Sequence, residues 1–421
     1  MMVARASRSL LRVGAVALAL QGCLPGSCGS DDYGRSDSDS DVDSDTDTDS
    51  DSDTDTDTDT GSGPETFPPW AGDAIAYILA NQNEDGTWFT GAQVNPDSGG
   101  GITVGTTALT GMALLEYWNV DPEGIRPALD EAIAACVNLV WRDPGSANDF
   151  DSVNWGQMFT LQLLARLVVH PAWKDRAVEF RGEIDALSPW FYGRQTGSGG
   201  FGYNSSFQTG AALIMLHELE QSGVVVDDAS VGAAIGLMED LRLPQAYLYS
   251  AGQGSWAGIS DDTALDYAAG RQAMSEYSLL LFDRTTEANL EDSFQLFIDH
   301  RDFLWETRAL TASGEWPRMG SASPFAYFAF FGYRYSAQSL DGVSDARRKE
   351  WAPILAEDLL AVQEDDGTWM NLPITSGGEA EVVYDADGNR IYQDFQANRE
   401  PGSKIYATAM ALMAFTHLWD G

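Results

Sequence analysis

Two neighbouring carboxylates, Asp261 and Asp262, lie in the stretch "GISDDTALDY" at 258–267. When two carboxyl groups share an apolar site, their repulsion and their loss of water raise the pKa of one of them. A carboxylic acid that stays protonated near neutral pH can donate a proton as a general acid. Acids and threonine are also favoured where a helix begins. The pair is therefore predicted either as a catalytic acid or as the acidic start of a helix.

Further polar and aromatic residues follow glycine-containing turns that recur along the chain, and they are candidates to line a central cavity. They are Tyr203, Trp256, Asp266, Arg318 and Tyr406. Two more candidates, Phe325 and Phe328, belong to the aromatic stretch "PFAYFAFFGYRY" at 324–335. Aromatic faces can hold an apolar chain or stabilise a positive charge that develops on it. Ordinary packing in a large core explains the same side chains equally well.

No metal site and no cofactor are predicted. The four histidines are isolated from one another along the sequence. The three cysteines have neither the spacing of zinc ligands nor the pattern of a disulfide framework. We expect a monomer without cofactors.

The candidate residues must be positioned by helices, and twelve segments have helical patterning. Successive segments alternate in how their apolar residues are distributed. They are 70–82, 104–119, 123–141, 153–169, 173–187, 206–221, 227–241, 266–284, 288–307, 324–338, 345–363 and 403–419. Even-numbered segments are apolar on nearly all sides, whereas odd-numbered ones are amphipathic. A helix that is apolar all round is buried, and an amphipathic helix has one face in water. The pattern predicts an all-α domain over 67–421, an (α/α)6 toroid of six helical-hairpin repeats with six inner and six outer helices.

The turns between these segments repeat a short motif. "QNEDGTW" at 82–88 returns as "QEDDGTW" at 363–369, and "QTGSGGF" at 195–201 is a third copy. Regular spacing of about 50–60 residues indicates a stacked or closed array of similar units. The motif resembles the QW repeats of the squalene-hopene cyclase and protein prenyltransferase superfamily, in which Gln caps a helix end and Trp stacks into the joint between repeats. This resemblance implies the toroid, with Trp88, Trp256, Trp316 and Trp369 at joints.

The resemblance also implies a possible chemistry. Class II terpene cyclases carry Asp-x-Asp-Asp-Thr-Ala, whose middle Asp donates a proton to an alkene. The stretch "ISDDTA" at 259–264 matches this pattern, except that Ile259 stands where the first Asp belongs. Asp261 would then be the donor, Asp262 its neighbour, and the ligand an apolar, isoprenoid-like molecule that is bound or cyclised in a central cavity. Two alternatives stay open: a non-catalytic toroid that binds a ligand or partner, and a glycan-acting α/α toroid enzyme.

The N-terminal region has the features of an export signal and a tether. In residues 1–22, three arginines precede the apolar run "VGAVALAL" at 13–20. The following "LQGC" resembles a bacterial lipobox, which implies lipidation of Cys23; the alternative is an ordinary signal peptide cleaved near Gly26 or Ser27. Residues 23–66 contain an acidic Ser/Thr/Asp tract, whose like charges predict a disordered, extended spacer. We expect an exported protein held by lipid to a bacterial membrane, at the outer membrane or cell surface.

The overall charge narrows the class of partner. The formal net charge of the 421 residues is −40, which repels phosphate backbones and anionic headgroups. Nucleic acid is therefore excluded, and the lipid anchor is the only membrane contact expected. The partner is predicted to be an apolar small molecule or an unknown surface ligand.

One insertion interrupts the helical pattern, at 371–402. Its stretch "EVVYDADGNRIYQDF" at 381–395 predicts a β-hairpin with Asp-Gly at the turn. Because the insertion follows a Gly-x-Trp turn, the hairpin is expected to project over the mouth of the cavity.

Overall fold

The computed structural model describes eight stretches of the chain. They are 67–88, 101–140, 150–202, 204–244, 246–250, 261–305, 328–371 and 400–419. For 101–102, 150–153, 261–264, 267, 328 and 400–403 it describes the backbone only. The signal peptide, Cys23, the tether and the 381–395 hairpin lie outside the described residues.

The described chain is built from α-helices, in agreement with the all-α prediction. The helices are α1 (Ala71–Ala80), α2 (Gly101–Glu116), α3 (Pro122–Leu139), α4 (Phe150–Val169), α5 (Ala177–Tyr192), α6 (Ser206–Gln221), α7 (Asp228–Leu241), α8 (Asp261–Leu280), α9 (Glu287–His300), α11 (Phe328–Ser339), α12 (Asp345–Ala361) and α14 (Glu400–Leu418). Three short 3-10 segments lie at Trp118–Val120, Pro171–Arg176 and Leu340–Gly342. Within these stretches there is no strand, only isolated bridges. None of the described helices is both long and apolar enough to cross a lipid bilayer.

The two kinds of helix differ in burial as their sequences predict. In α6, every residue from Ser206 to Leu216 is buried. In α7, burial follows one face, with Val231, Ala234 and Met238 inside and the opposite side in water. An amphipathic helix buries only its apolar stripe, whereas an apolar one needs neighbours on all sides. The helices therefore sort into an inner set and an outer set.

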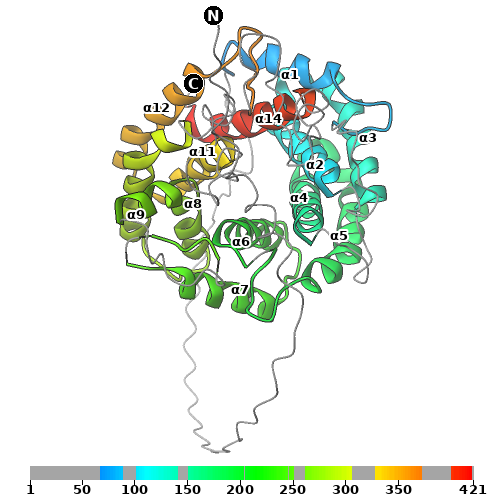
Figure 1. The fold of residues 1–421 in the computed structure, drawn as a ribbon. Coiled ribbons are helices and arrows are strands. Elements are labelled where there is room, and N and C mark those ends of the chain that lie inside the picture. The colour runs from blue at the N-terminus through cyan, green and yellow to red at the C-terminus, as the bar shows by residue number, and fades with distance from the viewer. Residues whose placement is uncertain are drawn as a thin grey trace, which may run out of the picture.

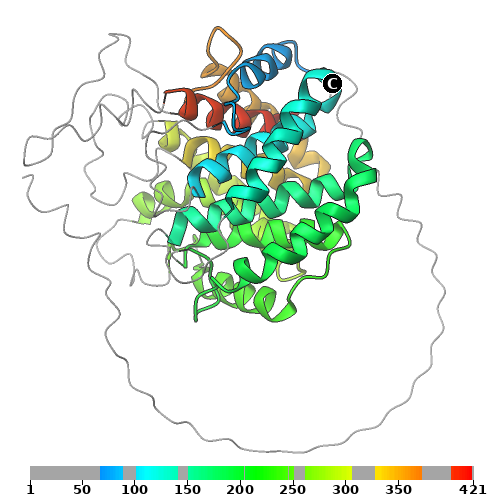
Figure 2. The same ribbon diagram turned by 90° about the vertical axis from the view of Figure 1, so that its right-hand side faces the viewer.

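The inner helices pack in a cyclic order. Each of α2, α4, α6, α8, α11 and α14 contacts the next, and α14 contacts α2 again. The outer helices α3, α5, α7, α9 and α12 pack outside this series, and α1 lies near α14 and α3 (Figure 1). Figure 2 shows the same helices from the side. The inner helices are thus linked in one continuous series of pairwise contacts.

The three motif copies share one turn structure. In each, the Gln side-chain amide donates a hydrogen bond to the carbonyl of the glycine four residues later. The distances are 3.1 Å for Gln82–Gly86, 2.7 Å for Gln195–Gly199 and 2.9 Å for Gln363–Gly367. These glycines have φ values of 79°, 90° and 79°, a left-handed conformation that a Cβ would strain. The motif therefore sets the exit from the three outer helices α1, α5 and α12.

The aromatic residue of the motif joins three elements. The indole N–H of Trp88 donates to the carbonyl of Ile78 at 2.8 Å, and that of Trp369 to the carbonyl of Leu359 at 2.7 Å, both in the preceding outer helix. The backbone N–H of Trp369 donates to Thr408 Oγ1 of the following inner helix at 3.1 Å. Trp88 and Trp369 thus lie at joints between repeats, while Trp256 and Trp316 lie outside the described residues.

The last turn closes on the first outer helix. Gln82 also donates to the carbonyl of Ala128 in α3 at 2.8 Å, and Gln195 to that of Ser230 in α7 at 2.7 Å. Each turn therefore rests on the next outer helix. The turn at Gly367 lies against Trp70 and Asp73, at the start of α1. The last turn therefore contacts the first outer helix, just as each earlier turn contacts the outer helix that follows it.

Candidate functional site

The predicted acid pair begins an inner helix. Asp261 and Asp262 are the first two residues of α8, and their side chains lie outside the described part. Phe328 is the first residue of α11, and its side chain also lies outside the described part. Tyr203, Trp256, Arg318 and Phe325 lie outside the described residues altogether. Asp266 and Tyr406 remain as the predicted site residues whose contacts are described.

Asp266 pairs with a residue of an outer helix. Its Oδ1 lies 2.7 Å from Nδ1 of His300, the last residue of α9. The contact joins the start of α8 to the end of α9, as expected for antiparallel neighbours. No sequence signal pointed to His300, because the two residues are 34 positions apart. Asp266 therefore engages the outer layer through this bond.

Aromatic side chains from three inner helices meet near the axis. Trp155 of α4 stacks on Phe207 of α6 with ring centroids 5.8 Å apart, and its edge contact with Phe331 of α11 measures 5.6 Å. Because α4 and α11 are opposite members of the cycle, these rings bridge it. Phe159 and Tyr249 extend the stack at 5.3 and 5.4 Å. We call these five residues the aromatic group; Trp155 and Tyr249 are half-buried, and the others are buried.

Next to the aromatic group lie a guanidinium and two phenols, which we call the Arg334 group. Arg334 and Tyr335 of α11 are 2% and 0% exposed, and the guanidinium carbon lies 3.9 Å from the centroid of the Tyr335 ring. Burial lowers the pKa of Arg334. Burial raises the pKa of the Tyr335 phenol and that of Tyr406 in α14, and each is also affected by the charge of Arg334. Tyr406, expected at the cavity, therefore lies on the helix next to the one that carries Arg334 and Tyr335, which sequence reasoning missed.

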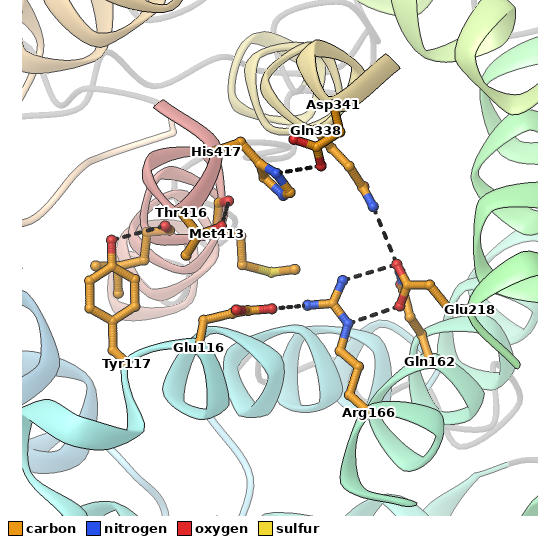
Figure 3. Close-up of polar contacts among 11 residues, drawn as sticks. Glu116, Tyr117, Gln162, Arg166, Glu218, Gln338, Asp341, Met413, Thr416 and His417 are labelled. Carbon is orange, nitrogen blue, oxygen red and sulfur yellow. Dashed lines mark hydrogen bonds and ion pairs between the residues drawn. The ribbon is translucent and has the colours of Figure 1, made fainter. Parts of the chain in front are cut away.

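A second polar cluster lies at the C-terminal ends of the inner helices, and we call it the Arg166 cluster (Figure 3). Arg166 of α4 donates two hydrogen bonds to Glu218 of α6, from Nε to Oε2 at 2.9 Å and from Nη2 to Oε1 at 3.0 Å. Its Nη1 lies 2.5 Å from Oε1 of Glu116 in α2. The amides of Gln162 and Gln338 donate to Glu218 Oε1 at 2.8 and 3.3 Å. Four inner helices thus contribute to one network.

The charges of the Arg166 cluster stabilise one another. Burial disfavours the charged form of Arg166, but the carboxylates of Glu218 and Glu116 outweigh it and raise the pKa of the guanidinium. Burial likewise opposes ionisation of Glu218, yet Arg166 holds the pKa of this carboxyl below its ordinary value. Both groups stay charged across the neutral range, so the cluster is an ion-pair network and not a proton donor.

An ion pair beside this cluster involves the end of α14. His417 Nδ1 lies 2.9 Å from Asp341 Oδ2, and Arg348 approaches the other oxygen of Asp341 at 3.2 Å. The backbone carbonyl of His417 accepts a hydrogen bond from Arg348 as well. These contacts attach the last inner helix to α12 and the loop before it.

The two polar groups differ in what they can still bind. Arg166 is paired with two carboxylates, whereas Arg334 makes no ion pair among the described residues and only feels the charge of Glu218 from farther away. Among the described residues, no group of three or more His, Cys, Asp or Glu side chains could hold a metal ion. A faint signal for both groups exists in the sequence, because Arg166, Glu218 and Arg334 are charged residues in otherwise apolar segments.

Comparisons with known proteins give no relative for this chain: no family model, no curated protein and no solved structure matches it.

Proposed function

We propose that this chain is an exported (α/α)6 toroid that binds an apolar, isoprenoid-like molecule between its inner helices without transforming it. The observation that carries the proposal is the meeting of Trp155, Phe207 and Phe331 across the cycle. The ring of Trp155 is only half-buried, so this group has a partly exposed apolar surface that a ligand could contact.

Two features support the toroid within this proposal. The inner helices contact one another in cyclic order, and the turn after α12 rests on the start of α1. The repeated Gln-x-x-x-Gly-x-aromatic turns explain how one local structure can generate a closed array. The 381–395 segment, as a β-hairpin, would then stand over the end at which the inner helices begin.

Binding is favoured over cyclisation for a reason in the chain itself. Proton donation to an alkene needs a carboxylic acid that is kept protonated, and a second acid nearby helps to raise its pKa. Ile259 occupies the position of the first Asp in the terpene cyclase pattern. Asp261 therefore lacks one of the acids that the pattern provides.

Tryptophan fluorescence and calorimetry with farnesol and squalene test the binding function on the full mature chain. We expect saturable binding that Trp155→Ala weakens on the order of tenfold, which equals about 1.4 kcal/mol. Trp190→Ala, on the outer helix α5, serves as the matched control and should leave the affinity unchanged. Circular dichroism checks that both variants fold.

The same incubations are analysed by mass spectrometry to separate the alternatives. A cyclised or hydrated product that is lost in Asp261→Asn would replace binding by catalysis. Retention of glycan fragments, with no binding of either isoprenoid, would favour the glycan-acting alternative.

We propose that Cys23 anchors the chain to a bacterial membrane through lipid. Labelled palmitate should be incorporated when the full-length chain is expressed in a bacterial host, and Cys23→Ser should abolish incorporation because the acylated thiol is gone. Cys28→Ser is the control and should keep the label. Label that persists in Cys23→Ser would contradict the anchor.

A further inference from the structure

Arg334 is a buried cation without a carboxylate partner. The side chain is 2% exposed, its Nη1 has no hydrogen-bond partner, and it takes part in none of the ion pairs of the described residues. Arg166 differs in this respect, because it forms ion pairs with Glu116 and Glu218 on the two neighbouring inner helices. A buried charge without a partner costs several kcal/mol, roughly. Such a group is retained at little cost when something else supplies the counter-charge.

Glu218 attracts Arg334 through its charge but makes no ion pair with it among the described residues. Glu218 Oε1 accepts hydrogen bonds from Arg166, Gln162 and Gln338, and Oε2 accepts from Arg166. A carboxylate accepts about four hydrogen bonds in all, and Glu218 already accepts four without one from Arg334. The guanidinium of Arg334 is left with donors that the protein does not use.

Two phenols extend this set of donors. The hydroxyl of Tyr335 is buried and has no hydrogen-bond partner. Tyr406, on the adjoining helix α14, is close enough for its ionisation to be affected by both Arg334 and Tyr335. A guanidinium only donates hydrogen bonds, and a neutral phenol can donate one. Two donors of α11, Nη1 of Arg334 and the hydroxyl of Tyr335, therefore lack an acceptor, and the phenol of Tyr406 lies on the neighbouring helix.

We propose that Arg334, Tyr335 and Tyr406 form a binding site for a carboxylate group. The planar fork of a guanidinium matches the two oxygens of a carboxylate, and a phenol can donate to the same group. A carboxylate brings one negative charge into the neighbourhood of Glu218, whereas a doubly charged phosphate would bring two. The site therefore selects a monoanion.

The carboxylate has two possible sources. It can belong to a small free acid, or it can be the acidic end of the apolar ligand that we place against the aromatic group. The second source rests on the proposed function. It follows from the contact between Phe331 and Tyr335, whose ring centroids are 4.6 Å apart. An apolar body against Phe331 would bring an acidic end within reach of Tyr335.

Calorimetric titration of the full mature chain with three probes tests the site. The probes are sodium acetate, farnesoic acid and its matched alcohol, farnesol. We expect farnesoic acid to bind at least tenfold more tightly than farnesol, and Arg334→Met and Tyr406→Phe to remove this difference. Tyr192→Phe, which changes a phenol on α5, should not alter it. If acetate also binds, a small free acid is sufficient for the site. If acetate does not bind, the carboxylate must be the acidic end of a larger ligand.

The outcomes separate this site from the proposed function. Equal affinity for farnesoic acid and farnesol, together with no binding of acetate, overturns the carboxylate site and leaves apolar binding intact. Acetate binding that Arg334→Met abolishes, without binding of either isoprenoid, keeps the site and overturns the proposed function. No binding of any probe overturns both.

A stability measurement keeps the proposal testable if a variant binds nothing. Without acid present, Arg334→Met should leave the melting temperature unchanged or raise it, because the substitution removes a charge that has no partner. Tyr335→Phe should behave in the same way, since its hydroxyl is unused. Tyr333→Phe is the matched control and should lower the melting temperature, because that hydroxyl bonds Asp358 and Trp305. A loss in Arg334→Met as large as that in Tyr333→Phe would show that Arg334 is satisfied within the protein and overturn the site.

Discussion

Replacing Arg166 by methionine is expected to lower the free energy of unfolding by about 3 kcal/mol. The substitution leaves the carboxylates of Glu218 and Glu116 close together without the cation that they share. Only 20% of the Glu218 side chain is exposed to water. Losses of about 3–5 kcal/mol are usual when one member of a buried ion pair is removed. The lower end applies here because 34% of the Glu116 side chain is in water. Chemical denaturation monitored by circular dichroism measures the change.

The double variant Arg166→Met/Glu218→Met is the control for this prediction. It removes both charges, so much of the lost stability should return, as it does when a buried ion pair is replaced by apolar side chains. A double variant no more stable than the single one would mean that Arg166 acts through packing of its methylene groups, not through charge.

Acid should weaken the same cluster. Arg166 depresses the pKa of Glu218 in the folded chain. A depressed carboxyl pKa contributes stability that is present above the ordinary value, about 4.3, and is lost as the pH falls through the lowered value. The melting temperature of the wild type should therefore fall more steeply below pH 4.3 than that of the double variant. Parallel curves for the two proteins would contradict this role of Glu218.

Replacing Trp369 by alanine is expected to cost about 3–5 kcal/mol of stability. The side chain is 0% exposed, and its indole donates a hydrogen bond to Leu359. Its ring contacts Trp70 with centroids 4.9 Å apart and Phe415 at 5.8 Å. The substitution therefore opens a cavity where the first and last repeats meet. Denaturant titration of wild type and variant gives the difference.

Val225→Ala serves as the surface control for this cavity. Val225 is 95% exposed, so its truncation should change stability by no more than about 0.5 kcal/mol. A similar small effect in Trp369→Ala would contradict the idea that this joint closes the helical array.

The acidic residues at the start of α8 show how far motif reasoning extends. The sequence predicted both a proton donor and a helix start for Asp261 and Asp262, and the backbone places them as the first two residues of α8. Helix-start preferences are local, so a short stretch can reveal them. Whether either carboxylate is protonated depends on the groups around it, which come from distant parts of the chain. The catalytic interpretation therefore stays a prediction.

The repeat motif and the alternation of helices were determined by the sequence. Gln82 and Gln363 bond the glycine four residues later in the same way, and this geometry depends only on a local turn. The alternation between buried and half-exposed helices follows from side-chain hydrophobicity along each segment. Both are short-range properties, and they predicted the all-α architecture and the approximate positions of the twelve described α-helices.

The pairing of polar groups inside the molecule was decided by the tertiary structure. Arg166 meets Glu218 from 52 positions away, and Gln338 reaches the same carboxylate from 120 positions away. Which charge finds a partner depends on how neighbouring helices are rotated and staggered against one another, and hydrophobic periodicity fixes neither to within a hydrogen-bond length. For that reason Arg166 and Arg334, two arginines in similar apolar helices, have different surroundings: Arg166 is held by two carboxylates, and Nη1 of Arg334 has no hydrogen-bond partner.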